Sequence, residues 1–317
     1  MLSFTSLKLR DVATIGSGSF GRVDLAWSDV EEQYYAVKKY NIHETVEESR
    51  VEYVKREKEL LSIISSPFIV QLICTHMDKT NLYIVMEFVH GGELINYLDD
   101  ITDEVLNNTA RFYSMEIICA LQHIHSKNIA YRDLKPENLL LTQNGHIKLS
   151  DFGLAKRIKG KTYTICGTIE YIAPEVFMKK GYDVNVDWWS LGVLIFELFT
   201  GNPPFCGDNN ELIDAICKAS VDIPESVPDS VRRLILSLLN RDPSQRALNI
   251  TNQKWFDNID WDEVRCLAIQ PPIIPSEFDV NEMAPVVKIT DAVDSVQRER
   301  DLFADWDEVL PAEADRT

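Results

Sequence analysis

The chain has 317 residues, of which 45% are hydrophobic and 26% charged, and its formal net charge is −18. This length predicts about two domains or two lobes, with enough core to fold without disulfides or metals. The acidic balance argues against nucleic acids and anionic membranes as partners, because both need positive patches; it suits a basic partner, although solubility alone is the simpler explanation.

Signals for membranes, secretion and metals are weak throughout the sequence. No apolar run approaches the roughly 18 residues that cross a bilayer, and the N-terminal residues lack the long apolar core of a secretory signal. The six cysteines include no C-x-x-C pair, which favours reduced thiols over a metal site. The six histidines show no spacing typical of metal ligands. We therefore expect no membrane insertion and a cytoplasmic location, with the nucleus as a second compartment.

Residues 1–90 have the pattern of a small, strand-rich lobe with one helix. Alternating, β-rich segments predict the strands, and dense charge with apolar residues at helical spacing predicts the helix. The strands are expected on both sides of a glycine-rich turn in 9–27, at 33–40, near 69–76 and near 81–88, and the helix at 44–65.

Residues 91–270 have a mainly helical pattern, which makes the fold class α+β. Asn144-Gly145 is the strongest short turn signal and predicts a hairpin over 139–149. Residues 271–317 begin proline-rich and become acidic, so we expect a C-terminal tail along the surface of the body. Helices are expected at 104–126, 187–200, 229–240 and 246–256.

The first chemical motif is Gly16-x-Gly18-x-x-Gly21-x-Val23. Glycines let the backbone approach phosphate oxygens closely and point amide groups at them. A dinucleotide-binding turn has similar spacing but needs a helix straight after the third glycine. A predicted strand follows here instead, which favours a cover over nucleotide phosphates.

The second motif is Lys38, in Ala36-Val37-Lys38 on a predicted strand. A lysine that grips phosphates needs a carboxylate to hold it, and Glu57 in the predicted helix is the candidate. Each residue taken alone would be interpreted as an ordinary surface charge.

The remaining motifs are Tyr131–Asn138, Asp151-Phe152-Gly153 and Ala173-Pro174-Glu175. In this order and spacing they match a phosphotransfer signature: Asp133 accepts the proton of the attacking hydroxyl, and Lys135 neutralises charge on the γ-phosphate. Asn138 and Asp151 are the candidates for holding Mg²⁺.

These motifs together resemble the eukaryotic protein kinase family from about residue 12 to about residue 260. Within it the chain is most similar to the basophilic AGC group, and there to the cyclic-AMP-dependent subfamily, in which Tyr131 typically replaces a histidine. The resemblance is carried by GSGSFGRV at 16–23, MEFVHGGEL at 86–94, YRDLKPENLLL at 131–141, DFGLAKRIKGKTYTICGTIEYIAPEV at 151–176 and VDWWSLGVLIFEL at 186–198.

The resemblance implies a bilobal kinase fold that uses ATP and Mg²⁺, with residues 1–90 as the N-lobe, 91–270 as the C-lobe and 271–317 as an AGC-type tail. It implies a catalytic set of Asp133, Lys135, Lys38 and Glu57, and metal binding by Asn138 and Asp151. Adenine would lie between the lobes, bonded by the backbone at Glu87 and Val89, with Val85 among the apolar residues around it. The full implied nucleotide set is Ile15, Gly16, Gly18, Ser19, Phe20, Gly21, Val23, Ala36, Lys38, Glu87, Val89, Glu93 and Leu140.

Thr164 matches an activation-loop phosphorylation site in the resembled family. A phosphate there would be clamped by Arg132 and Lys156. Tyr53 departs from the pattern, because related kinases have a histidine there that reaches the same phosphate. Coupling between Thr164 and the helix that carries Glu57 is therefore expected to be weaker.

The resemblance also implies a serine or threonine acceptor and a preference for basic protein sequences. Bidentate pairing with carboxylates favours arginine over lysine. A cyclic-nucleotide-binding regulatory subunit is the implied partner. The residues expected to recognise substrate arginines are Glu93, Glu137, Glu170 and Glu197, and those expected to line the pocket for the following residue are Ile165, Ile169 and Ile172, of which Ile169 replaces a usual proline.

Structural roles are implied for several further residues. Glu175 and Arg246 should form a buried salt bridge, and Asp187 should hold the catalytic-loop backbone. In the tail, Phe303-x-x-Trp306 resembles an aromatic motif that docks on the small lobe. Asp307 follows where relatives carry a phosphorylatable residue, and the hypothesis is that its fixed charge replaces phosphorylation.

Two alternative functions remain open from the sequence. One is a pseudokinase scaffold, against which the intact Lys38, Asp133, Asn138 and Asp151 argue. The other is an active AGC kinase of a neighbouring subfamily that responds to a different signal.

Overall fold

A computed structural model describes residues 3–18, 21–98, 103–218, 220–246, 249–280 and 296–307. The chain divides into two compact units, which are treated separately below. Unit 1 comprises Met1–Ser66, Val70–His90 and Glu277–Thr317, and unit 2 comprises Pro67–Ile69 and Gly91–Ser276.

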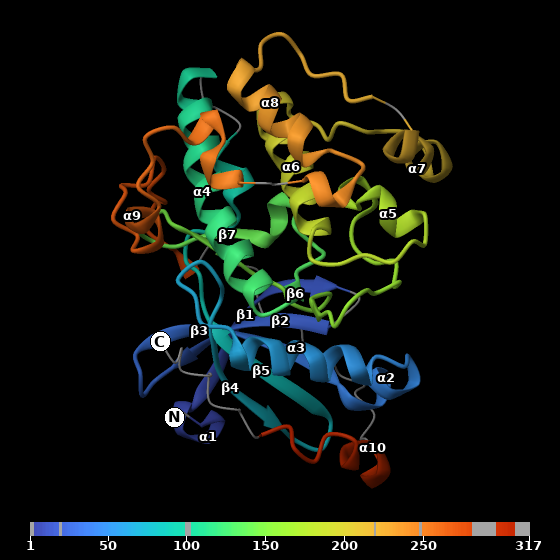
Figure 1. The fold of residues 1–317 in the computed structure, drawn as a ribbon. Coiled ribbons are helices and arrows are strands. Elements are labelled where there is room, and N and C mark those ends of the chain that lie inside the picture. The colour runs from blue at the N-terminus through green and yellow to red at the C-terminus, as the bar shows by residue number, and fades with distance from the viewer. Residues whose placement is uncertain are drawn as a thin grey trace. The chain divides into compact units, whose positions relative to one another are not determined.

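Unit 1 is built on a five-stranded antiparallel sheet in the order β1-β2-β3-β5-β4 (Figure 1). The predicted strands are all present, within a few residues of their expected bounds. Their bounds are Leu9–Gly18 for β1, Gly21–Ser28 for β2, Gln33–Asn41 for β3, Leu72–Met77 for β4 and Asn81–Glu87 for β5.

The single helix predicted at 44–65 is wrong in detail, because the structure divides it into two. Helix α2 (Ile42–Glu47) begins at Asn41, whose side chain accepts a hydrogen bond from the backbone of Glu44. Helix α3 (Val51–Ile63) follows after Ser49, which has a φ of +57°. A non-glycine residue in the left-handed region ends a helix, and this change of direction gives α3 its own axis.

The core of unit 1 also receives the two chain ends. The short helix α1 (Phe4–Leu7) places Leu7 in a buried cluster on the sheet. In the tail, α10 (Gln297–Asp301) leads to Phe303 and Trp306, which are both buried. Thr75 donates a hydrogen bond to the Trp306 carbonyl at 2.7 Å, so the aromatic motif of the tail packs on unit 1, as its resemblance to a docking motif implied.

Unit 2 is mainly helical. Helices α4 (Asp103–Ser126), α6 (Val186–Thr200) and α8 (Asp229–Leu238) pack against one another (Figure 1). Nearly every residue of α6 is buried, as its apolar sequence predicted. The smaller helices are α5 (Pro174–Phe177), α7 (Asn209–Lys218) and α9 (Trp261–Arg265).

Two short pairs of antiparallel strands lie among the loops of unit 2. Strands β7 (Leu139–Leu141) and β8 (Ile147–Leu149) form the predicted hairpin, and Gly145 adopts a φ of +87° at its turn. Strand β6 (Ile129–Ala130) pairs with β9 (Lys156–Arg157).

The helix predicted at 246–256 is wrong. The described part of this segment contains the 3₁₀ turns η5 (Ile250–Asn252) and η6 (Lys254–Phe256), separated by Gln253 in an extended conformation. Trp255 and Phe256 are both buried, so packing of adjacent aromatic rings replaced helical periodicity as the organising interaction.

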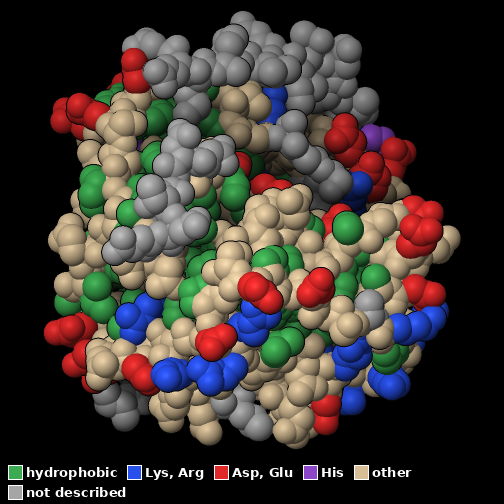
Figure 2. Space-filling model, turned by 90° about the horizontal axis from the view of Figure 1, so that it is seen from above, with side chains coloured by type: hydrophobic (Ala, Val, Ile, Leu, Met, Phe, Trp, Pro, Cys, Tyr) green, Lys and Arg blue, Asp and Glu red, His purple; other side chains and the backbone are tan. Residues whose placement is uncertain are grey.

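The surface carries both signs of charge. Figure 2 shows one face on which acidic side chains are scattered among lysines and arginines. Among the described residues, no helix combines the length and apolarity that a membrane span requires.

Candidate functional site

The glycine-rich motif lies where β1 meets β2 in unit 1. Gly16 pairs with Val23 and Gly18 with Gly21, while Ser19 and Phe20 lie outside the described residues. Gly21 has a φ of +131°, and a Cβ there would lie 2.5 Å from the Lys39 carbonyl oxygen. Only glycine fits this position without strain.

The sheet face next to this motif leaves apolar side chains partly exposed. Ile15, Val23 and Ala36 are neither buried nor fully exposed, which suits residues that would contact a ligand. Val89, just after β5, is buried, and the Glu87 carboxylate accepts a hydrogen bond from the Gln71 amide at 2.7 Å.

The expectation that Val85 contacts adenine is wrong. Val85 pairs with Val37 on β3 and lies fully buried in the core cluster of unit 1. Directly paired residues share a face, and successive residues alternate. Met86 pairs with Ala36 and therefore shares the sheet face that carries Ala36 and Lys38, a position that strand alternation in the sequence could have identified.

Lys38 and Glu57 form the predicted pair within unit 1. The Lys38 ammonium donates to Glu57 Oε1 at 2.7 Å, and the two residues are only 5% and 2% exposed. Because both residues are buried, removal of one would leave the other charge without a counterion in a low-dielectric environment, which is costly.

In unit 2, polar side chains converge on Asp133. Asn138 Nδ2 donates to Asp133 Oδ2 at 2.9 Å and to its carbonyl at 2.7 Å. Lys135 Nζ lies 3.2 Å from Asp133 Oδ2, and Thr168 donates to Oδ1 at 3.4 Å. These contacts aim a carboxylate that keeps some solvent access, as a base for an incoming hydroxyl requires.

The side chain of Asp187 fixes the backbone of the loop that carries Asp133. Its two carboxylate oxygens accept from the backbone amides of Tyr131 and Arg132, each at 2.8 Å, as predicted. His125, which has no motif that would assign it to this site, contacts the same carboxylate at 2.7 Å. Arg132 has a φ of +69°, so these bonds hold a backbone conformation that an isolated loop would avoid.

The residues predicted to bind Mg²⁺ offer the right atom types. Asn138 directs its amide nitrogen to Asp133, which leaves its oxygen as the metal-binding atom, and Asp151 is an exposed carboxylate. Among the described residues, no group of three or more His, Cys, Asp or Glu could hold a metal ion by itself. Mg²⁺ is typically held by one or two protein groups together with substrate phosphates, so the set fits that ion.

Cationic and hydroxyl groups surround the segment that contains Thr164. Arg132 donates to the Tyr182 hydroxyl at 2.9 Å, and Tyr182 donates in turn to the Thr164 carbonyl at 2.5 Å. Lys156 Nζ donates to Thr162 Oγ1 at 2.9 Å. Tyr182 was not singled out from the sequence, because a lone tyrosine has no motif signal.

The four predicted recognition glutamates come together in unit 2. Burial raises the pKa of Glu93, and the nearby Glu137 carboxylate raises it further. Burial also raises the pKa of Glu197, against a lowering hydrogen bond from Tyr171, while Glu137 and Glu170 raise it. The mutual effects identify one acidic cluster whose repulsion is relieved by a proton or by an external cation.

The three isoleucines predicted to contact a substrate differ in exposure. Ile165 is 49% exposed, Ile169 is partly exposed and Ile172 is buried. Ile172 lines a small cavity that also includes Cys166 and Tyr182.

The predicted buried salt bridge of unit 2 is also present. Arg246 donates to both oxygens of Glu175, at 2.6 and 2.7 Å, and its guanidinium lies 5.1 Å from the centre of the Trp189 ring. This bidentate pair is architectural, because both residues are buried.

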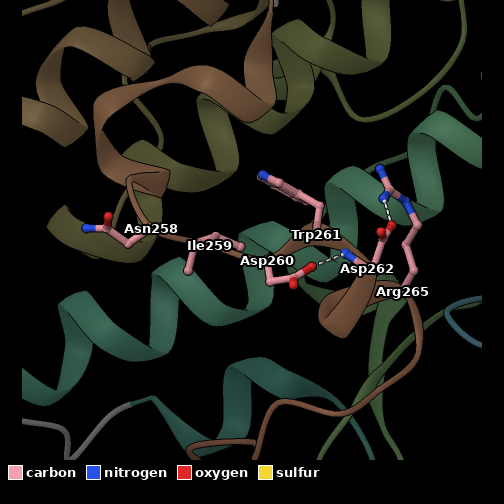
Figure 3. Close-up of a pocket in the computed structure, with 6 residues that line it drawn as sticks. All are labelled: Asn258, Ile259, Asp260, Trp261, Asp262 and Arg265. Atoms are coloured by element: carbon pink, nitrogen blue, oxygen red, sulfur yellow. Dashed lines mark hydrogen bonds and ion pairs between the residues drawn. The ribbon is translucent and has the colours of Figure 1, made fainter.

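A surface hollow of about 560 Å³ lies at the start of α9 and contains no predicted site residue (Figure 3). Its polar groups pair with one another: Asp260 accepts from the Asp262 amide, and Arg265 bonds to the Asp262 carboxylate. These groups do not converge on a common point where a ligand would bind.

Comparisons with known proteins agree with the geometry. The protein kinase domain family matches residues 9–256. The chain is 40% identical over 316 residues to "cAMP-dependent protein kinase, catalytic subunit-like" of Caenorhabditis elegans, covering 96% of this chain and 79% of the relative. It is 43% identical over 272 residues to "cAMP-dependent protein kinase catalytic subunit PRKX" of Homo sapiens, covering 83% and 76%. It is 41% identical over 270 residues to "cAMP-dependent protein kinase type 3" of Saccharomyces cerevisiae, covering 83% and 68%.

Proposed function

The chain belongs to the protein kinase family and is a protein serine/threonine kinase, and from this premise we propose that it transfers the γ-phosphoryl group of Mg-ATP to residues that follow arginines. The observation that carries the proposal is the convergence of Lys135, Asn138 and Thr168 on the Asp133 carboxylate. Such a cluster orients a base and supplies positive charge beside it.

Asp133 accepts the proton of the attacking serine or threonine hydroxyl. Asn138 and Thr168 hold opposite oxygens of its carboxylate, which limits rotation and keeps the base aimed. Lys135 offers a positive charge beside the transferring phosphoryl group. Catalysis of this kind depends on positioning and charge stabilisation rather than on covalent intermediates.

Unit 1 contributes the nucleotide-holding residues. Lys38, oriented by Glu57, binds the α- and β-phosphates, and the backbone of Gly16, Gly18 and Gly21 covers them. The backbone at Glu87 and Val89 bonds the adenine. The apolar residues that unit 1 is proposed to place around the adenine are Ile15, Val23, Ala36 and Met86.

Asn138 and Asp151 are the residues that would hold Mg²⁺. When bound, this ion neutralises negative charge on the phosphates. The protein's own part is to present two oxygen ligands, one of them on the residue that also orients Asp133.

The acidic cluster of Glu93, Glu137, Glu170 and Glu197 is proposed to bind substrate arginines. Burial and then the neighbouring carboxylates raise the pKa of Glu93 and Glu197, so an arginine placed among these side chains would gain from each. The same surface would bind an arginine-bearing segment of a regulatory partner. The relatives are named as catalytic subunits of cAMP-dependent protein kinases, which supports a cyclic-nucleotide-binding regulatory subunit as that partner.

Phosphorylation of Thr164 is proposed to order the segment around it. Arg132 already reaches the Thr164 backbone through Tyr182, and Lys156 bonds to Thr162 two residues away. A phosphate would bring nearly two negative charges to these cations.

The proposal is tested by assaying purified protein with Mg-ATP on the peptides Arg-Arg-Ala-Ser-Leu and Ala-Ala-Ala-Ser-Leu, with an Asp133→Ala variant alongside. Transfer to the arginine peptide that depends on Asp133 supports the proposal. Equal transfer to both peptides would remove the role of the glutamates and keep the kinase. Absence of transfer, even with Thr164 phosphorylated, would favour the pseudokinase scaffold.

A further inference from the structure

Tyr40 of unit 1 touches three parts of the nucleotide-holding machinery. It follows Lys38 by two residues on β3, so both side chains lie on the same face of the sheet. Tyr40 is 3% exposed, and its hydroxyl donates to Glu57 Oε2 while Lys38 donates to Oε1. The two oxygens of one carboxylate are thus bound by two different groups of β3.

The Tyr40 ring makes the other two contacts. Lys38 Nζ lies 5.5 Å from the centre of the ring. A Cβ built on Gly21 would lie 3.2 Å from Tyr40 Cδ1, so the ring also borders the third glycine of the phosphate cover. One side chain therefore contacts Glu57, Lys38 and the start of β2.

The chemistry of this contact favours a fixed hydrogen-bond donor. Burial and the Glu57 carboxylate raise the pKa of Tyr40 well above its ordinary value, so the phenol stays protonated. A buried carboxylate oxygen that loses its donor keeps the full cost of desolvation. The hydroxyl is thus a neutral partner for Glu57 that adds no second positive charge beside Lys38.

Other described contacts of α3 act at residues other than Glu57; Lys58, for example, donates to the Asp305 carbonyl at 2.5 Å. The first residue of α3 follows Arg50, which makes no side-chain cap, and Tyr53 carries no positive charge with which to bind a phosphate. The Tyr53 ring instead lies 5.3 Å from the Arg56 guanidinium on the same helix.

We propose that Tyr40 is a positioning residue for phosphoryl transfer, whose hydroxyl holds Glu57, and through it Lys38 and α3, in the orientation that binds nucleotide. The inference rests on the proposed function for the role of Lys38. It adds a residue that acts through Glu57 rather than on the substrate.

The alternative is that Tyr40 is only a core tyrosine whose hydroxyl found a partner. Tyr35 provides a matched control, because it is also on β3, is 2% exposed and has a hydroxyl bonded to the Gln33 side chain. Tyr35 lies in the core cluster on the opposite face of the sheet. Tyr40→Phe and Tyr35→Phe each remove one oxygen and keep the ring.

The experiment measures kcat/KM for ATP, the Kd for Mg-ADP by calorimetry, and thermal unfolding for wild type, Tyr40→Phe, Glu57→Ala, the double variant and Tyr35→Phe. We expect Tyr40→Phe to lower kcat/KM about tenfold and weaken Mg-ADP binding, because a charged hydrogen bond is lost. In the Glu57→Ala background the same change should have no further effect, since coupled residues are not additive. Tyr35→Phe should leave both quantities within about twofold of wild type.

The outcomes separate this inference from the proposed function. Unchanged kinetics in Tyr40→Phe, or effects that simply add to those of Glu57→Ala, would overturn the role of Tyr40 and leave the kinase intact. A wild type that binds Mg-ADP but transfers no phosphate would overturn the proposed function, and the binding cycle alone would then decide on Tyr40. A wild type that binds no nucleotide would overturn both.

Discussion

The charged clusters of the two units differ in how their charges are balanced. In unit 1, Lys38 and Glu57 are buried and neutralise each other, with Tyr40 on the second oxygen of the carboxylate. In unit 2, burial raises the pKa of Glu93 and Glu197, and neighbouring carboxylates of the acidic cluster raise it further. The first cluster is neutralised within the fold, and the second is the one proposed to bind a cation from outside.

This difference follows from burial. A charge removed from water must find its counterion within the protein, because the desolvation penalty is otherwise unmet. Partly exposed carboxylates can repel one another at modest cost, since water screens them. This is consistent with the proposed roles, in which the phosphate-holding pair is buried and the surface for a basic peptide is partly exposed.

The largest expected effect separates chemistry in unit 2 from nucleotide holding in unit 1. Asp133→Asn should lower kcat about 10³-fold, because a general base contributes between about 10² and 10⁴. The Kd for Mg-ADP should stay within about twofold, since Lys38 and Glu57 are untouched. Timed phosphate-transfer assays measure kcat, and calorimetry measures the Kd for Mg-ADP.

Asp214→Asn is the control for that experiment. Asp214 is exposed and pairs only at the surface with Lys218, so its loss should leave kcat unchanged. Comparable losses of turnover and of nucleotide binding in Asp133→Asn would break the division of labour between the units.

The next effect tests whether unit 2 also contains a charge pair that is complete within the fold. Arg246→Ala should lower the free energy of unfolding by about 4 kcal/mol, because Glu175 would be left buried without its partner. Arg265→Ala removes an exposed pair with Asp262 and should cost under about 1 kcal/mol. Urea unfolding of both variants measures the difference, and equal losses would refute the importance of burial.

A smaller effect is expected at the acidic cluster itself. Glu197→Gln should raise KM for the arginine peptide about tenfold, because one charge-assisted contact is lost, and leave KM for the alanine peptide unchanged. Glu225→Gln, at an exposed position outside the cluster, is the matched control. If the two peptides responded alike, the cluster would not be an arginine site.

The pH dependence of the same site has a definite sign. The pKa of Glu197 is raised in the fold, so its contribution to stability is full below its ordinary value near 4.5 and is lost as pH rises through the folded value. Binding of arginine needs the ionised form and should increase over the same interval. Measured upward from pH 4.5, the KM for the arginine peptide and the unfolding free energy should thus both fall, and Glu197→Gln should flatten both.

The smallest expected effect concerns the tail on unit 1. Asp307 lies 3.8 Å from His76 and is 58% exposed, so Asp307→Ala should lower unfolding free energy by under about 1 kcal/mol. Trp306→Ala, which empties a buried site, should cost about 4 kcal/mol. An Asp307→Ala protein that is identical to wild type in melting temperature and activity at low salt would end the idea that this charge replaces a phosphate.

The site residues were predictable where their motifs have a rigid spacing. Asp133 and Asn138 are five residues apart in one loop, so the sequence already implied that their side chains meet. Lys38 and Glu57 come from different elements, yet both were identified because the family pattern pairs them. Val85 was assigned wrongly because the register of β5 decides which residues face the ligand.

Tyrosine contacts were beyond the reach of sequence reasoning. Tyr40, Tyr171 and Tyr182 each donate a hydrogen bond to a group 17 or more residues away, and none has a motif of its own. A tyrosine hydroxyl lies far from its own backbone, so its hydrogen-bond partner is decided only when separate elements pack together. The break between α2 and α3 was missed for a related reason, since a left-handed Ser49 leaves no compositional signal.

The sequence by itself determined the family and its chemistry, because local spacing and residue type carry that information. It also determined the strands of unit 1 and the buried helix α6, because periodicity and apolarity are local properties. Only the tertiary structure decided which charges are neutralised inside, which are left to repel, and which tyrosine holds Glu57. These depend on burial and on distances between elements remote in the chain, and those quantities exist only after packing.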